Sequence, residues 1–303
     1  MRRVRKPAGR ASGGLLRRAL PLAVLSPSLL AIAVGVYGFI AFTIVVSFTR
    51  SKMFPRWDWV GLRQYPRLFR NSRWEVAVDN MLVFGALYVL VSTLLGLAMA
   101  ILIDQKIRAE GLLRTIYLYP LALSFIVTGV VWQWLLNPGL GIQKMVRSWG
   151  WEGFELRWIT DPDTAIYCIV LAGVWQVAGF SMAMFLSGLR GMNPEIVSAA
   201  RIDGAPTWRI YQRVVIPALR PVFLTAFVVQ AHLAIKSYDL VVALTQGGPG
   251  LATQLPSTFM YATTFTRNDM GQGATSAVMM LLAVAAVMVP YLYSELRAER
   301  TSA

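Results

Sequence analysis

Long stretches without a charged residue alternate with short charged segments along the whole chain. A bilayer core of about 30 Å takes roughly 20 apolar residues when crossed as a helix. Backbone amides cannot stay unpaired in hydrocarbon, so stretches of this length are predicted to be transmembrane helices. Five stretches qualify, bounded by Arg18 and Arg50, Asp79 and Asp104, Arg114 and Lys144, Asp163 and Arg190, and Asp269 and Glu295.

A sixth charge-free stretch, residues 221–235, is shorter than a spanning helix. It reaches that length if residues 217–220 and 236–240 join it, because the charges of Arg220 and Lys236 can snorkel or face protein. The sequence therefore predicts an all-α, polytopic membrane protein with six transmembrane helices.

The first helix is predicted at residues 21–49, after a basic segment at residues 1–20. A cleaved secretory signal has the same order, but its apolar core is about 7–15 residues long. The stretch here is about twice that length. We therefore expect a retained helix that follows a basic cytoplasmic tail.

The distribution of Lys and Arg predicts the orientation. With the N-terminus inside, 17 of the 29 basic residues fall on the cytoplasmic side, in agreement with the positive-inside rule. Both termini are then cytoplasmic. The outer segment 50–79 is an exception, and it either binds an acidic partner face or lies along lipid headgroups. Its basic residues are Arg50, Lys52, Arg56, Arg63, Arg67, Arg70 and Arg73.

Composition agrees with a membrane protein, since 56% of residues are hydrophobic and only 15% are charged, against about 25% charged in soluble domains. The net charge of +14 could indicate nucleic-acid binding. Here the basic residues flank apolar spans, where they anchor helix ends in anionic headgroups. We expect contact with membrane lipid and no nucleic acid.

The chain lacks the residues for its own catalysis or ATP binding. None of the five lysines follows a glycine, so no P-loop exists. The single histidine, His232, and the single cysteine, Cys168, exclude a histidine-based metal site and an internal disulfide. Ion-coupled carriers keep ionisable residues inside the membrane, and these helices have almost none. The chain is predicted to be a transporter subunit without a cofactor, not an enzyme, driven by an external motor.

A short helix is predicted in the cytoplasmic segment between the fourth and fifth spans. Asn193 or Pro194 opens it, because Asn caps helix N-termini and Pro suits the first turn. Glu195 then lies in that first turn, where a negative charge meets the positive end of the helix dipole.

A second helix follows after a turn. Gly204 supplies the left-handed conformation after Asp203, and Pro206 begins the next helix. Pro217 and Pro221 end it and lead into the fifth span. The result is a compact helix-turn-helix suited to a cleft in another protein.

Residues 198–205, followed by Pro217, resemble the EAA loop of ABC importer permeases. That pattern usually begins with Glu, and Ser198 stands in its place. The resemblance implies that loop 190–217 docks into a separate ATPase, which uses ATP and Mg²⁺; the alternative is an ordinary amphipathic loop. The implied coupling residues are Glu195, Ser198, Ala199, Ala200, Asp203, Gly204, Ala205 and Pro217.

Two further resemblances refine the family. Residues 244–249, with Gly247, Gly248 and Pro249, and residues 259–265 resemble the external Gly-Gly-Pro segment of maltose-type carbohydrate permeases. Residues 231–240 and 290–297 resemble glucose/mannose-type permeases most.

The resemblance covers a permease core at residues 75–297, helices 2–6, and leaves a tail at 298–303. It implies a type I ABC importer permease-like bundle in a bacterial plasma (inner) membrane. Its implied partners are a second permease subunit, an ATPase dimer and an extracytoplasmic sugar-binding protein.

In the maltose-type group, helices 4 and 5 line the sugar path. Aromatic faces stack on sugar rings, and amides and hydroxyls replace water around sugar hydroxyls. The alternative is that the matching residues only pack helices together. Nearby, Lys236 and Asp239 are spaced to pair on one helix face. The matching residues are Trp175, Gln176, Phe180, Gln230, Leu233 and Ser237.

A second function stays open from the sequence. An ATP-independent secondary carrier or channel for small polar solutes would need no ATPase and would show flux in liposomes alone. A membrane-embedded enzyme would need clustered catalytic groups, and the sequence has none.

Overall fold

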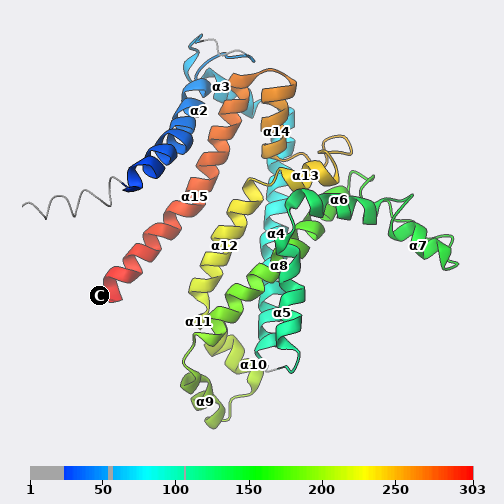
Figure 1. The fold of residues 1–303 in the computed structure, drawn as a ribbon, viewed down its shortest axis with the longest axis vertical. Helices are drawn as coiled ribbons and strands as arrows, with labels where there is room; N and C mark the ends of the chain where they lie inside the picture. Colours follow the sequence, from blue (N-terminus) through cyan, green and yellow to red (C-terminus); the bar gives the residue numbers. More distant parts are fainter. Residues whose placement is uncertain (1–23, 54–56, 106, 303) are drawn as a thin grey trace, which may run out of the picture.

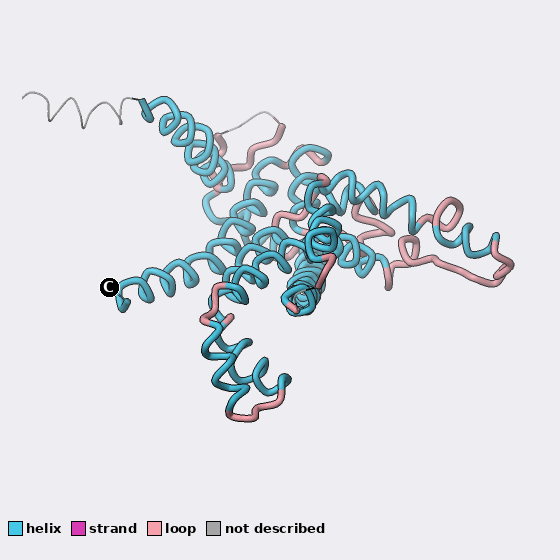
Figure 2. The backbone as a smooth tube through the Cα atoms, turned by 60° about the horizontal axis from the view of Figure 1, so that its bottom comes forward, coloured by secondary structure: helices cyan, strands magenta, loops and turns pink. Residues whose placement is uncertain are grey.

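The computed structural model describes residues 24–53, 57–105 and 107–302. The predicted basic tail, residues 1–20, and the first residues of the predicted helix 21–49 lie outside this range. The described residues form helices and loops without a strand, apart from one isolated bridge between Thr49 and Trp59 (Figure 2). The all-α prediction is confirmed.

The helices differ widely in length, and several short ones fill the connections. Those in the first half are α2 (Phe39–Ser47), α3 (Gln64–Phe69), α4 (Ser72–Asp104), α5 (Glu110–Leu118), α6 (Phe125–Leu136), α7 (Ile142–Ser148) and α8 (Ala165–Arg190). The others are α9 (Pro194–Ile202), α10 (Thr207–Ile210), α11 (Ile216–Ala218), α12 (Arg220–Ile235), α13 (Asp239–Leu244), α14 (Pro256–Tyr261) and α15 (Met270–Ser302). Short 3₁₀ segments are Gly61–Arg63 and Tyr119–Ala122, and π-helical turns are Ala33–Gly38, Tyr211–Val215 and Ala262–Thr266.

Four unbroken helices are long and apolar enough to cross a membrane, and two bent pairs bring the total to six if each pair is one span. The predicted six spans are compatible with this arrangement. The unbroken helices are Val24–Ser47, Ser72–Asp104, Ala165–Arg190 and Met270–Ser294. The pairs are Glu110–Ala122 with Phe125–Leu136, bent by 99°, and Thr207–Ala218 with Arg220–Ile235, bent by 63°.

The sharper bend has a local cause that a charge-free run cannot reveal. Pro120 opens a 3₁₀ turn, and Leu123 is extended. The Ser124 side chain then accepts a hydrogen bond from the Val127 amide and begins α6 anew. The bend leaves the Leu123 carbonyl without a partner in its own helix, and Gln176 Nε2 donates to Leu123 O over 2.7 Å. The bend is therefore part of the packed bundle.

The second bend lies at Leu219, between Pro217 and Pro221. Its position agrees with the prediction that these prolines end one helix and lead into the next. Leu219 is buried, so packing fixes the bend.

The packed centre is α8, against which α4 lies along much of its length. Small residues permit the close approach, since Gly96 faces Ser181 and Gly173 faces Tyr88. Burial covers 72% of the most apolar window of α8, compared with 6% for Val24–Ser47. The first span is therefore peripheral, and it packs mainly on α15.

Two helices extend beyond a bilayer core. α4 and α15 have 33 residues each, or about 50 Å at 1.5 Å per residue. α4 begins at Ser72, so the end of the predicted outer segment 50–79 belongs to the helix. At the other end of the chain, the predicted tail from residue 298 is helical to Ser302.

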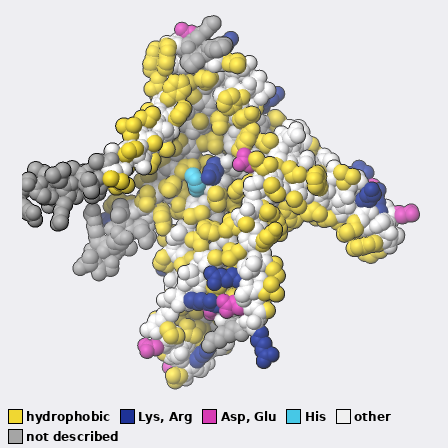
Figure 3. All heavy atoms as spheres, in the orientation of Figure 1, with side chains coloured by type: hydrophobic (Ala, Val, Ile, Leu, Met, Phe, Trp, Pro, Cys, Tyr) yellow, Lys and Arg dark blue, Asp and Glu magenta, His cyan; other side chains and the backbone are white. Residues whose placement is uncertain are grey.

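The molecule has two distinct ends along its long axis. α9 lies at one end and α3 at the other, with α2 and α15 on one side and α7 projecting on the opposite side (Figure 1). Hydrophobic side chains cover much of the face in Figure 3, whereas charged ones gather near the α9 end and on the projecting arm. A largely apolar face of this kind is typical of a membrane-spanning bundle.

Candidate functional site

The predicted short helix of loop 190–217 is present as α9. The Asn193 side chain accepts a hydrogen bond from the Glu195 amide over 3.0 Å, and Pro194 occupies the first helical position. Ser198 Oγ donates to Pro194 O over 3.0 Å. The side chain that stands where the family pattern has Glu therefore bonds within its own helix.

The turn after α9 also follows the prediction. Gly204 has φ = +73°, and an added Cβ would meet nothing within 4 Å. Backbone conformation, rather than space, therefore favours glycine here. The Gly204 amide donates to Arg201 O and the Ala205 amide to Ala200 O, which closes the helix end. Pro206 directly precedes α10.

The loop has an inner and an outer apolar face. Val197, Ala200, Ala205, Tyr211 and Val214 pack against a buried core cluster. That cluster comprises Leu97, Ala100, Ile103, Met182, Phe185, Leu186, Leu189, Ile210, Val215, Leu219 and Ala226. The outer face exposes Ile196 (53%), Ile202 (86%) and Trp208 (58%). Large apolar groups exposed on a loop are candidates for contact with another protein.

Polar contacts hold the base of the loop to the bundle. Arg190 pairs with Glu110 over 2.7 Å and approaches Asp104 at 3.7 Å. Gln105 Nε2 donates to the Tyr211 hydroxyl over 2.9 Å. These contacts join loop 190–217 to the ends of α4 and α5.

The Gly-Gly-Pro segment forms the predicted turn, between α13 and α14. Gly247 and Gly250 have φ of +87° and +60°, and Thr253 Oγ1 donates to Gly248 O over 2.7 Å. Asn80 Nδ2 on α4 donates to two carbonyls of the following residues, each over 3.0 Å. The turn is thus fastened to α4, away from α9 (Figure 1).

Two of the six predicted path residues are buried and bonded between helices. Gln176 reaches the bend at Leu123, as described above. Gln230 Nε2 donates to Thr93 Oγ1 and to Ser181 Oγ, each over 3.2 Å, and so links α12 with α4 and α8. Interhelical amide bonds of this kind stabilise membrane bundles.

The other four path residues also have contacts within the bundle. Trp175 is 38% exposed and contacts Trp132 edge-on, with ring centroids 6.0 Å apart. Phe180 and Leu233 pack partly buried against the core, and the Ser237 carbonyl accepts from Ser257. A sugar path through these six residues stays a prediction.

An apolar groove of about 620 Å³ lies between α4, α12 and α15. Its lining side chains are apolar and include Trp74, Met81, Phe227, Ala234 and Met279. A sugar would find almost no hydrogen-bond partners there. The groove instead suits the apolar surface of another helix.

Polar and aromatic side chains form a cluster beyond α12 that the sequence analysis did not predict. Tyr238 and Tyr261 have ring centroids 5.0 Å apart, and Tyr261 and Phe265 4.9 Å. Lys236 and Asp239 are exposed beside Tyr238, and the predicted ion pair between them is absent. Burial, with Tyr261 adding, raises the pKa of Tyr238. The sequence shows that Tyr261 and Phe265 are four residues apart, as neighbours on one helix face are. The contact of Tyr238 with Tyr261 depends on the fold.

The single histidine lies near this cluster. His232 is one helical turn before Lys236 and is partly exposed.

The chain is similar to known proteins of one family. Residues 92–297 match the family model described as the binding-protein-dependent transport system inner membrane component. A probable ABC transporter permease protein of Pyrococcus horikoshii is 39% identical over 91% of this chain and 95% of its own length. The xylose/arabinose import permease of Haloferax volcanii is 31% identical over 86% of this chain and 83% of its own.

Solved structures agree on the fold. A chain of a bacterial ABC transporter that imports the acidic polysaccharide alginate covers 96% of this chain and 99% of its own length, with a TM-score of 0.79 and 18% identity. Permease subunits of this kind are not themselves enzymes. The chain belongs to the family of inner-membrane components of binding-protein-dependent transport systems, the permease subunits of ABC importers.

Proposed function

We propose that this chain forms half of the translocation pathway of an ABC sugar importer and that loop 190–217 couples it to a separate ATPase. The apolar outer face of that loop carries the proposal. Ile196, Ile202 and Trp208 are exposed at the charged end of the bundle, where burial against another protein is favourable. ATP and Mg²⁺ belong to the ATPase, because this chain has no P-loop.

The mechanism we propose is alternating access. Two ATPase copies grip loop 190–217 and the matching loop of a second permease, and their closure on ATP rocks the helices. The capped ends of α9 and the contacts of Arg190 make the loop stiff enough to transmit that motion.

Sugar is the substrate class that the comparisons support. Relatives are named for xylose/arabinose and, in Thermococcus litoralis, for trehalose/maltose, and the structural neighbour imports alginate. The cluster of Tyr238, Tyr261 and Phe265 adds stacking surfaces beside the charged groups of Lys236 and Asp239. Glucose, mannose or a related sugar is our finer proposal, from residues 231–240 and 290–297. Competition of unlabelled glucose, mannose, xylose and maltose against radiolabelled glucose uptake tests it.

The partners follow from the same proposal. A second permease packs on the apolar groove between α4, α12 and α15, and a sugar-binding protein delivers solute at the end opposite α9. The ends of the chain then lie in the cytoplasm. Accessibility of single cysteines to a membrane-impermeant thiol reagent tests this orientation.

Gly204→Pro tests the coupling role. Proline cannot adopt φ = +73° and has no amide to donate to Arg201 O. We expect membrane insertion to persist and radiolabelled sugar uptake to fall to background. Gly150→Pro, at another left-handed glycine in the external arm, is the matched control and should leave ATPase binding intact. Undiminished uptake in Gly204→Pro would refute the coupling role.

Reconstitution tests the alternative of an ATP-independent carrier or channel. Sugar flux into liposomes that hold this chain without an ATPase would favour that alternative. The importer requires ATPase, binding protein and ATP together.

A further inference from the structure

A cavity of about 810 Å³ lies just beyond the ends of two spanning helices. The first span ends at Ser47, and the last begins at Met270. The cavity walls come from the residues that follow the former and precede the latter, together with the start of α3, so the cavity lies at the level of lipid headgroups. Its lining residues are Arg50, Lys52, Val60, Arg63, Gln64, Arg67, Arg267, Asn268 and Asp269.

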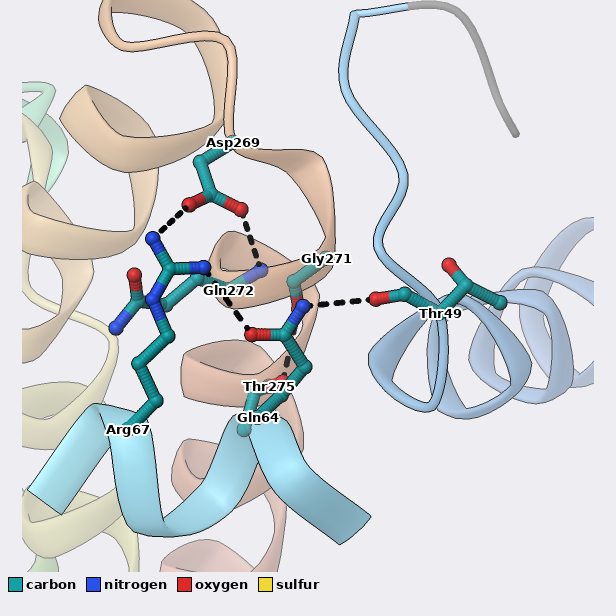
Figure 4. A network of polar contacts seen from close by, with 7 residues as sticks. All are labelled: Thr49, Gln64, Arg67, Asp269, Gly271, Gln272 and Thr275. Carbon is teal, nitrogen blue, oxygen red and sulfur yellow. Dashed lines mark hydrogen bonds and ion pairs between the residues drawn. The ribbon is translucent and has the colours of Figure 1, made fainter. Parts of the chain in front are cut away.

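The cavity carries excess positive charge, since it has five basic side chains and one carboxylate. Asp269 is already engaged, because it pairs with Arg67 over 3.0 Å and accepts from the Gln272 amide over 3.2 Å (Figure 4). Among the described residues, no carboxylate lies within ion-pair distance of the other four basic side chains. Burial, and then the charge of Arg73, lower the pKa of Arg267. Both causes disfavour a cation that has no anionic partner.

The walls are held by specific contacts. Gln64 is buried, donates to Thr49 O over 2.9 Å and accepts from Arg67 at 3.4 Å. The Gly271 amide donates to Ser51 O over 2.9 Å, and a side chain at 271 would overlap Thr49 O. Figure 4 shows this network joining α3, α15 and the end of the first span. The basic side chains are therefore presented by a fixed frame.

The surroundings are apolar. Trp57, Trp59 and Leu62 are each more than half exposed, and tryptophan concentrates at membrane–water interfaces. The first span leads away from the cavity with 6% of its most apolar window buried, which leaves room for acyl chains. An acidic protein face would meet this apolar rim less favourably than a lipid would.

We propose that this cavity binds the phosphate of an anionic phospholipid headgroup, with the acyl chains lying along the first span. The site bridges the end of the first span and the start of α15. It is independent of the proposed transport function and of which membrane surface the cavity faces.

Lipid titration followed by native mass spectrometry tests the proposal, with the full chain purified in its assembled transporter. The probes are phosphatidylglycerol and phosphatidylcholine with identical acyl chains, and inorganic phosphate. The variants are Arg63→Gln, Arg267→Gln and their combination. Arg70→Gln is the control, because Arg70 is an exposed basic residue of the same segment that does not line the cavity.

We expect phosphatidylglycerol to bind more tightly than phosphatidylcholine. Each Lys or Arg near an anionic surface contributes about 1 kcal/mol, or about fivefold in affinity. The double variant should therefore bind phosphatidylglycerol about 25-fold more weakly, while Arg70→Gln should change little.

Three results would overturn the proposal. The first is equal phosphatidylglycerol affinity in the double variant and the wild type. The second is saturation by inorganic phosphate without preference between the two lipids, which would assign the site to a free anion. The third is unchanged lipid binding with a loss of binding-protein capture by the double variant in phosphatidylcholine vesicles, which would assign it to an acidic protein face.

Discussion

The two helices α8 and α9 follow each other closely in sequence but differ in how much of their surface is buried. Most residues of α8 are buried, whereas none of α9 is. α8 is apolar around its whole circumference, as expected of a helix inside a bundle. α9 packs one face and leaves Ile196 and Ile202 exposed. Substitutions in α8 should therefore report stability, whereas substitutions in α9 should report binding.

The largest effect should come from Gly179→Ala in α8. A methyl group at 179 would overlap the carbonyl oxygen of Tyr117 on α5, and backbone cannot move aside as a side chain can. We expect a loss of about 3 kcal/mol or more, seen as low yield and early thermal aggregation in size-exclusion chromatography. Gly111→Ala on α5, where nothing lies within 4 Å, should leave the yield unchanged. Wild-type behaviour of Gly179→Ala would mean that α8 is less tightly packed than described.

The next largest effect is expected for a substitution that tests the proposed binding role of α9. Ile202→Asp places a charge on a side chain that is 86% exposed, so the free energy of unfolding should change by about 0.5 kcal/mol or less. Binding of the ATPase should weaken by about 2 kcal/mol, roughly thirtyfold. Pull-down with the ATPase subunit measures this, and Ile107→Asp in the loop between α4 and α5 is the control. Equal loss in both variants would show that added charge, and not the α9 surface, is responsible.

A smaller effect should come from the base of the loop. Arg190→Gln removes the contacts with Glu110 and Asp104, which are partly exposed, so stability should fall by only about 1 kcal/mol. Because the loop loses its attachment, the ratio of sugar imported to ATP hydrolysed should fall more than ATPase binding does. Arg190→Lys should recover part of that ratio. Parallel losses of binding and ratio would indicate general unfolding of the loop.

The smallest effect is expected for a substitution of Ser198. Ser198→Glu breaks the bond to Pro194 O and places a carboxylate three residues before Arg201, a spacing worth about 0.2–0.5 kcal/mol on a helix. We expect a thermal shift near the limit of detection and a change in ATPase affinity of about twofold or less. An increase of tenfold or more would show that the ATPase carries a basic partner for this position.

Local features of loop 190–217 could be predicted because their causes lie close together in sequence. Asn193 caps α9, Gly204 takes the left-handed turn, and Leu219 bends between two prolines. The six spans predicted from charge-free lengths are compatible with four unbroken helices and two bent pairs. The 99° bend could not be predicted in this way. A charge-free run shows only composition, whereas the direction of the chain changes where Ser124 caps the start of α6.

Features that depend on distant segments could not be predicted. Gln176 and Gln230 look in sequence like groups for a sugar, yet their amides donate to other helices. The contact between Tyr238 and Tyr261 depends on the turn at Gly247–Gly250. Likewise, the basic residues around 50–67 gain their shared cavity only when residues 267–269, which precede α15, close it.

The sparse packing of the first span has a consequence for shortened forms of the chain. Val24–Ser47 contacts the rest of the described residues mainly along α15, whereas α4, α8 and α12 pack on one another. Lipid tails are as apolar as the side chains of this span, so they can cover the surface of α15 that its removal would expose. A chain without Val24–Ser47 should therefore keep its central bundle.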